Sequence, residues 1–210
     1  MSRKNYSSWS LRGWLITKFS GLAFEEVLVS PDDQAVRAEI LLLSPFILVS
    51  CLNHNGVKIL DTLAIGEYLN EIKPKAGLLP ADKETRARCR SICGEMHSGF
   101  SAMHAALPMN LKGHFPNFKV WSRAHGDIEC ITTIWRECLE TYGGPYLFVG
   151  LFMADAMYAP VVTRLLTYDV QVDEVCSAYC REIMALPQMA EWIAVAQLEP
   201  DEFDELDVEF

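Results

Sequence analysis

The stretch HNGVKILDTLAIGEYLNE, residues 54–71, carries a turn, a strand and a helix start in direct succession. Asn55-Gly56 is the strongest short signal for a two-residue hairpin turn, because both turn positions need positive φ. It lies between the apolar segments Ile47–Leu52 and Val57–Leu60, so two antiparallel strands are predicted. Asp61-Thr62 follows, and both residue types cap helices well. The stretch therefore predicts a β-hairpin that leads directly into a helix.

Upstream of the hairpin, strand and helix patterns alternate. Leu11, Trp14 and Leu15 recur at helical spacing, and Gly21 suits a helix C-terminus. A first strand is expected to be shortened by several residues, since only Met1–Lys4 precede Asn5. The order predicted for this part is βαβαββα, in which the remaining elements are a helix over Ser10–Ser20, a strand over Phe24–Val29, a helix over Asp33–Leu43, the hairpin, and a helix over Asp61–Lys73.

Downstream, the segment Pro74–Pro80 reads as a connector, and no further hairpin pattern follows it. We therefore predict two domains, an α/β domain over residues 1–74 and an all-helical domain over residues 81–210 that ends in an acidic tail. The helices expected in the second domain are Asp82–Leu107, Asn117–Tyr142, Met153–Tyr168, Asp173–Leu186 and Gln188–Leu198.

Composition narrows the class of partner. Half of the 210 residues are apolar, which is enough for a substantial core, and the formal net charge is −10. That charge argues against nucleic acid and against an anionic membrane surface, both of which select basic proteins. The basic residues before Glu25 would attract a small anion, whereas the acidic segment Glu199–Phe210 reads as a solvated terminus.

Cysteine usage and hydropathy point to the cytoplasm. The seven cysteines form no CxxC pair, and no secretory signal is recognisable, so a reducing compartment is expected. The longest apolar stretch, Ile40–Leu52, contains Pro45 and is well short of the ~20 residues that span a bilayer. No transmembrane segment is predicted.

Three segments resemble glutathione transferases: NYSSWSLRGWL (residues 5–15), the hairpin-helix stretch 54–71, and FMADAMYAPVVTRLLTY (residues 152–168). The resemblance is to bacterial members and more loosely to the zeta class, and it covers nearly the whole chain. It implies a thioredoxin-like N-terminal domain that binds glutathione as cosubstrate, an all-helical C-terminal domain that holds a small electrophile, and a homodimer.

The resemblance also implies a glutathione site. It gives Asp61 the ammonium and Thr62 the carboxylate of the γ-glutamyl group, although an ordinary helix cap would also explain the pair. Thiolate stabilisation falls to donors near the first helix, and Asn5, Ser7 and Ser8 all lie within reach. Which of the three faces the sulfur stays open, as does a purely capping role.

The family normally carries Gly, a basic residue, Val and a cis-proline where this chain has Ile47, Leu48, Val49 and Ser50. The backbone at Val49 and Ser50 would contact glutathione, but a cis bond before a non-proline residue costs ~2.5–4 kcal/mol. The loop is therefore expected to be reshaped. Ser50→Pro is predicted to raise glutathione affinity. A second departure is Phe152 at the position where the family caps a helix with Ser or Thr.

The helical domain offers candidates for the electrophile pocket. Met96, Met103 and Leu107 could line it, although their spacing equally fits plain core. Cys89, Cys93 and His97 share one helix face, but no fourth ligand follows at a matching spacing, so no metal site is predicted.

Two functions follow from these residues. The first is a glutathione transferase that activates the glutathione thiol for conjugation, isomerisation or reduction of a small electrophile. The alternative is a non-catalytic dimeric scaffold that has lost glutathione binding, which the Ser50 departure favours. A thioredoxin-like disulfide exchanger is disfavoured, because no cysteine stands at the start of the first helix.

Overall fold

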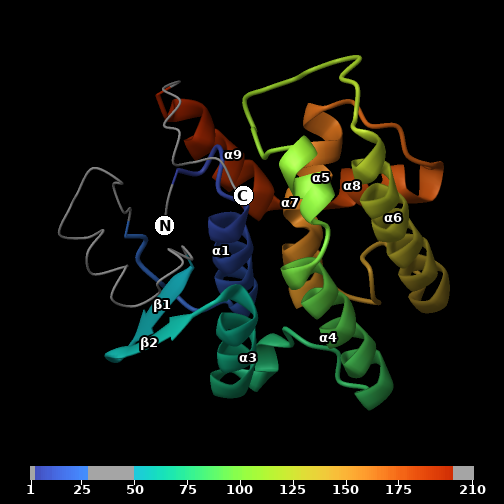
Figure 1. Cartoon of the computed structure of the whole chain (residues 1–210). Helices are drawn as coiled ribbons and strands as arrows, with labels where there is room; N and C mark the ends of the chain where they lie inside the picture. Colours follow the sequence, from blue (N-terminus) through green and yellow to red (C-terminus); the bar gives the residue numbers. More distant parts are fainter. Residues whose placement is uncertain (1–2, 28–49, 201–210) are drawn as a thin grey trace.

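The computed structural model describes residues 3–27 and 50–200, and it contains the predicted hairpin and helix (Figure 1). Strand β1 (Cys51–His54) pairs antiparallel with β2 (Val57–Leu60), so that Cys51 faces Leu60 across the ladder. Asn55 and Gly56 have φ angles of 53° and 84°. Both central residues of the turn thus take the positive φ that the Asn-Gly signal predicts, and the hairpin is confirmed.

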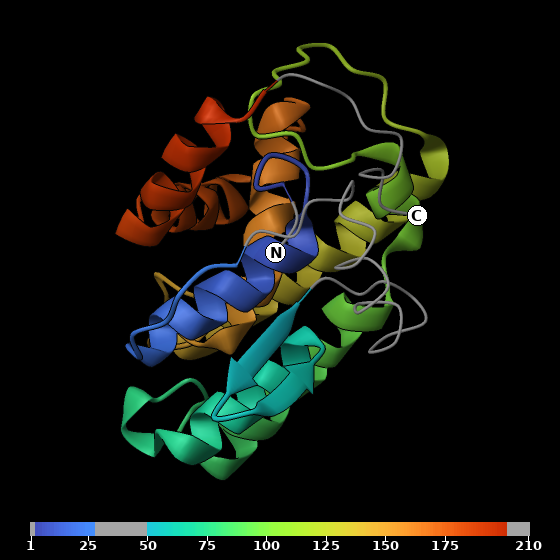
Figure 2. The same cartoon turned by 90° about the vertical axis from the view of Figure 1, so that its left-hand side faces the viewer.

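Two predicted helices of the N-terminal part are present, and α1 begins at Ser8, two residues before the predicted start at Ser10. Helix α1 (Ser8–Ser20) is capped by the Ser7 hydroxyl, which accepts from Ser10 N, and it stops at Gly21 with φ 65°. Helix α3 (Thr62–Ile72) is capped by the Asp61 carboxylate, which accepts from the backbone N–H groups of Leu63 and Ala64. Figures 1 and 2 show α1 lying alongside α3, with the hairpin next to them.

The other N-terminal elements are less regular than predicted. Residues 3–7 form a turn and a short coil, and residues 22–27 contain no strand, so in the described ranges the sheet has two strands. The helix predicted over residues 33–43 and the first residues of the hairpin lie outside the described residues. The predicted connector is a 3-10 turn, η1 (Pro74–Ala76), followed by a segment whose Leu78 carbonyl accepts from Met153 N at 2.8 Å.

The C-terminal part is all-helical, as predicted. The helix predicted over residues 82–107 is broken at Gly99-Phe100. Gly99 N donates to Glu95 O as the last hydrogen bond of the first helix, and Phe100 then takes a positive φ of 60°. The segment before Ser122 is also irregular, so the next helix starts later than predicted. The observed helices are α4 (Lys83–Ser98), α5 (Ser101–Ala106), α6 (Ser122–Tyr142), α7 (Met153–Thr167), α8 (Glu174–Met184) and α9 (Pro187–Leu198).

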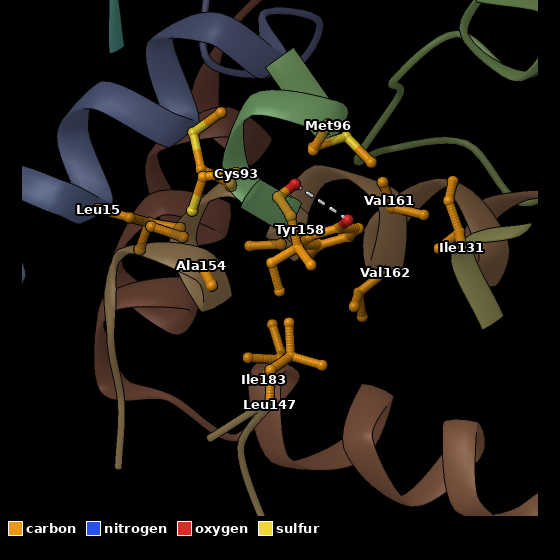
Figure 3. Packing of buried hydrophobic residues seen from close by; sticks show 14 of the residues in the cluster. Leu15, Cys93, Met96, Ile131, Leu147, Ala154, Tyr158, Val161, Val162 and Ile183 are labelled. Atoms are coloured by element: carbon orange, nitrogen blue, oxygen red, sulfur yellow. Dashed lines mark hydrogen bonds between the residues drawn. The ribbon is translucent and has the colours of Figure 1, made fainter. Parts of the chain in front are cut away.

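Helix α7 forms the centre of the core. Nearly all of its side chains are buried, and it packs against α1, α4 and α8. Figure 3 shows Tyr158 from α7 pointing toward α4, where its hydroxyl donates to Ile92 O at 3.2 Å. One apolar cluster contains Leu15 of α1, which precedes the connector in sequence, and Cys93 of α4, which follows it. The division into residues 1–74 and 81–210 stays a prediction, and the two parts share this interior.

The start of α7 lacks a capping side chain at Phe152, as predicted, but the Asp155 carboxylate compensates for the missing cap. Asp155 accepts from Phe152 N at 2.9 Å and from Leu147 N at 3.1 Å, and the Tyr179 hydroxyl donates to it. The Asp155 side chain is fully buried, and this desolvation outweighs the hydrogen bonds and raises its pKa to about 7. Among the described helices, none has the length and hydropathy needed to cross a bilayer.

Candidate functional site

The N-termini of α1 and α3 meet at Ser50. The Ser50 hydroxyl donates to Trp9 O at 2.7 Å, and the Ser50 carbonyl accepts from Asp61 N at 3.2 Å. A Cβ at Gly13 would lie 2.9 Å from Ser50 Oγ, so the glycine permits this approach. Both helix ends present backbone N–H groups and the positive end of a dipole, which suits an anion. The two segments that the sequence singled out therefore converge. Val49 lies outside the described residues.

Thr62 is the most unusual residue of this junction. It is fully buried at the first position of α3, and its hydroxyl has no hydrogen-bond partner within the described residues. A buried hydroxyl left without a partner costs about 1–3 kcal/mol. Such an atom indicates a ligand group or a water that completes the bond. The position next to the α3 dipole favours a negatively charged acceptor.

Asp61 precedes Thr62 and has a strained backbone, with φ 80° and ψ 137°. That conformation is uncommon for a residue with a side chain, and such strain is concentrated at functional sites. Its Oδ1 caps α3 by accepting from Leu63 N and Ala64 N, while Oδ2 lies 2.8 Å from His97 Nε2. The carboxylate is 28% exposed. It therefore keeps an accessible edge for a cationic group.

His97 comes from α4 and connects the helical part to the junction. Besides its contact with Asp61, its ring stands edge-on to Trp9 at a centroid distance of 5.0 Å. Its Nδ1 is buried without a partner among the described residues. The Arg12 guanidinium lies 4.8 Å from the centre of the Trp9 ring and donates from Nε to Met157 O. The wall of the site is thus built from α1, α4 and α7.

The three predicted thiol donors occupy different environments. Asn5 is 2% exposed; its Nδ2 donates to Asn110 Oδ1, and its Oδ1 accepts from Lys112 N. Ser7 is half-buried and caps α1, and its hydroxyl donates to Ser10 Oγ at 3.1 Å. Ser8 is fully buried. Both ends of the Asn5 side chain are engaged in holding the loop after α5.

The predicted electrophile-pocket residues lie inside the protein. Met96, Met103 and Leu107 are each 0% exposed, and Met96 Sδ accepts from Arg12 Nη2 at 3.2 Å. Their interior position gives them packing roles, so the prediction that they line a pocket finds no support in their burial. His104, one turn from Leu107, is only partly buried. Burial, Arg164 and Arg12 lower its pKa to about 2, so it is a neutral imidazole at neutral pH.

The cysteines on α4 do not join His97. Cys89 and Cys93 are fully buried in the core, whereas His97 turns toward Asp61. Within residues 3–27 and 50–200, no three His, Cys, Asp or Glu side chains form a group that could hold a metal ion.

The sequence pattern suggested only a metal-ligand role for His97, which was not predicted, and it gave no sign of the contact with Asp61. The two residues are far apart in sequence, and no local pattern links a histidine at the end of one helix to the cap of another. Glu199, which reads as part of the acidic terminus, was missed for the same reason. Its carboxylate accepts from Lys4 N and Asn5 N.

Together these features define a class of protein. A hairpin-helix unit and a helical part meet at a junction that brings together two helix N-termini, a strained acidic cap and a buried hydroxyl without a partner among the described residues. Such a junction suits a small molecule with both anionic and cationic ends, and the surrounding topology is that of glutathione-transferase-type proteins.

Comparison with known proteins agrees with this class. The family profile "Glutathione S-transferase, N-terminal domain" matches residues 2–77. The chain is 35% identical to maleylacetoacetate isomerase from Mus musculus over 189 residues, which cover 85% of this chain and 83% of the relative. It is 30% identical to the enzyme of the same name from Rattus norvegicus over 173 residues, covering 79% and 76% of the two chains.

Solved structures show the same fold. A glutathione transferase homologue from Burkholderia, crystallised with bound glutathione, superposes with a TM-score of 0.69 at 22% identity and covers 93% of this chain and 95% of its own. A glutathione transferase from Populus trichocarpa gives a TM-score of 0.73 at 13% identity, with 92% and 96% covered. The chain belongs to the glutathione S-transferase family, and the thioredoxin-like and all-helical fold class is confirmed.

Proposed function

We propose that this protein is a glutathione-dependent enzyme that activates the glutathione thiol for reaction with a small electrophile. The observation that carries the proposal is the buried hydroxyl of Thr62 at the N-terminus of α3, which has no hydrogen-bond partner among residues 3–27 and 50–200. A carboxylate of glutathione would accept from this hydroxyl next to the positive end of the α3 dipole. The exposed edge of the Asp61 carboxylate would take the ammonium group of the same γ-glutamyl unit.

The sulfur would then lie toward the start of α1. Hydrogen-bond donors and the positive helix end stabilise a thiolate there, and each unit of pKa lowering is worth about 1.4 kcal/mol. The hydroxyls at this helix start belong to Ser7 and Ser8, and the Ser7 hydroxyl would have to turn away from Ser10 Oγ to reach the sulfur. We favour the two serines over Asn5 as thiol donors because a hydroxyl redirects its proton by rotation, whereas the Asn5 amide is held at both ends.

The reaction we favour is isomerisation, because the curated relatives at 30% identity and above carry the name maleylacetoacetate isomerase. A thiolate that adds to one carbon of an unsaturated carbonyl compound turns the double bond into a rotatable single bond. Elimination of the thiolate after rotation restores the double bond, so the thiol is returned unchanged. The residues described here would hold glutathione in place and keep its sulfur ionised, while Trp9, whose ring contacts His97, would lie beside the space for the electrophile.

The main alternative is a non-catalytic, dimeric scaffold. The engagement of both ends of Asn5 and the serine at position 50 favour it. We place the enzyme first because Thr62 and Asp61 are arranged for a ligand. A homodimer and a cytoplasmic location belong to the same proposal, and light scattering at two protein concentrations tests the dimer.

The deciding experiment is retention on immobilised glutathione, followed by titration of the ultraviolet thiolate absorbance of the complex. Retention with a thiolate band that persists below the pKa of free glutathione supports the enzyme. Retention without the band would leave a binding protein, and no retention would leave the scaffold. Turnover is then tested with an activated aryl halide, an epoxide and a cis-configured unsaturated diketo acid.

A further inference from the structure

Residues 3–7 precede the site without belonging to a strand, yet several long-range contacts fix their position. The Glu199 carboxylate accepts from Lys4 N at 2.7 Å through Oε1 and from Asn5 N at 2.9 Å through Oε2. The Trp192 indole donates to Lys4 O at 3.0 Å. The end of α9 therefore holds the backbone of this turn from both its N–H and its carbonyl side.

The backbone of Glu199 is itself held in place. Glu199 N donates to Ala196 O as the last bond of α9, and the Lys112 ammonium donates to Glu199 O. Lys112 N also donates to Asn5 Oδ1, and Leu111 N donates to Asn5 O. Three segments far apart in sequence thus close a ring of hydrogen bonds around Asn5.

The ring of hydrogen bonds lies directly before Ser7 and Ser8, the two thiol donors that we favour. Ser7 follows Asn5 by two residues, and Ser7 N donates to Arg3 O at 3.1 Å, so the turn held by Glu199 ends at the α1 cap. Placement of donors to within a fraction of an ångström decides how well they stabilise a developing charge. In the described residues no strand holds the turn that precedes Ser7 and Ser8. The Glu199 carboxylate is instead bonded to the backbone of this turn.

We propose that Glu199 is a positioning residue for thiol activation, holding Ser7 and Ser8 in register with the sulfur through the backbone of Lys4 and Asn5. This inference rests on the proposed function and deepens it. Glutathione affinity would depend chiefly on Thr62 and Asp61, which Glu199 does not contact. Thiol ionisation would depend on the α1 turn, which it does hold.

The test compares Glu199→Gln with Glu191→Gln. The glutamine keeps the size of the side chain but can accept only one of the two N–H groups, and its amide opposes the other. Glu191 also lies on α9 and loses the same charge, yet its partner is Lys18 at 2.7 Å, away from the turn. Calorimetry gives the glutathione Kd of each variant, and titration of the thiolate band gives the pKa of the bound thiol.

For Glu199→Gln we expect a thiol pKa raised by about one unit, which is a roughly ten-fold smaller ratio of thiolate to thiol at a given pH. Its Kd, measured at a pH below the pKa of the bound thiol, should stay within about two-fold of wild type, the scatter of independent sites. Above that pH the raised thiol pKa itself weakens apparent binding through proton linkage. Glu191→Gln should match wild type in both. If Glu199→Gln does not fold, Lys112→Met loosens the same ring, and we expect a shift in the same direction.

A thiol pKa in Glu199→Gln equal to that of Glu191→Gln overturns the positioning role while leaving the enzyme proposal intact. A Kd that rises several-fold at a pH below the pKa of the bound thiol also overturns it, since weaker binding of the protonated thiol indicates a general structural loss. A wild-type protein with no thiolate band at all refutes the proposed function itself, so the two failures are distinguishable.

Discussion

Replacing Thr62 by valine tests the site most directly, because it should move stability and glutathione binding in opposite directions. Valine keeps the shape of threonine and replaces the hydroxyl by a methyl group. The Thr62 hydroxyl is buried and has no partner among the described residues, so the ligand-free protein bears its desolvation cost without compensation. Removing it should stabilise the free protein by about 1–2 kcal/mol.

Binding should respond in the opposite sense. A hydrogen bond to a charged group contributes about 1.5–3 kcal/mol, which is about 10- to 150-fold in Kd. For a chain of this size, 1 kcal/mol corresponds to about 2–4 °C in Tm. We therefore expect Thr62→Val to melt a few degrees higher without glutathione and to bind glutathione at least ten-fold more weakly. Differential scanning calorimetry and isothermal titration give the two quantities.

The matched control is Thr163→Val on α7. Thr163 is 3% exposed, and its hydroxyl donates to Pro160 O at 2.8 Å. This variant removes a satisfied hydroxyl far from the junction, so it should lose about 1 kcal/mol of stability and keep wild-type affinity. If Thr62→Val instead loses stability as Thr163→Val does, or binds glutathione as tightly as wild type, the hydroxyl is not a ligand group.

Three further outcomes follow from the structure. Gly66→Ala should destabilise by about 1–3 kcal/mol in chemical denaturation, since the new Cβ would clash with Met153 Sδ; an unchanged midpoint would show that the Met153 side chain moves aside without cost. Ser50→Pro should raise glutathione affinity in calorimetry while losing the hydrogen bond to Trp9 O, worth about 1 kcal/mol of stability, and equal affinity of the two forms would end that argument. Burial raises the pKa of Asp155 to about 7, so its contribution to stability is complete below about pH 4 and is lost as pH rises through 7. The unfolding free energy of wild type relative to Asp155→Asn should therefore fall across this range by on the order of 4 kcal/mol, and a pH-independent difference would contradict the shift.

Local chemistry was sufficient to predict the elements that frame the site. The positive φ angles of Asn55 and Gly56 and the capping of α3 by Asp61 depend on residues within a few positions of each other, and both predictions are confirmed. The same holds for the end of α1 at Gly21. Turn and cap energies act over one or two residues, so the sequence displays them directly.

Element boundaries failed where local signals were weak. The break at Gly99-Phe100 divides a region that the sequence pattern predicts as one helix. A single glycine is the only helix-stop signal in the sequence at this position. The strand predicted at Phe24 is not observed over residues 24–27. Strand formation needs a partner, and a pattern along one segment does not reveal whether a partner is in reach.

The sequence by itself determined the family, the hairpin-helix unit and the pair Asp61-Thr62, because each is written in contiguous residues. Only the tertiary structure decided that His97 reaches Asp61, that Glu199 binds the backbone before α1, and that Met96, Met103 and Leu107 are interior. The physical reason is that these contacts join segments separated by tens to nearly two hundred residues. Their geometry depends on how whole helices pack, and helical spacing alone cannot distinguish a side chain that faces the core from one that faces a ligand.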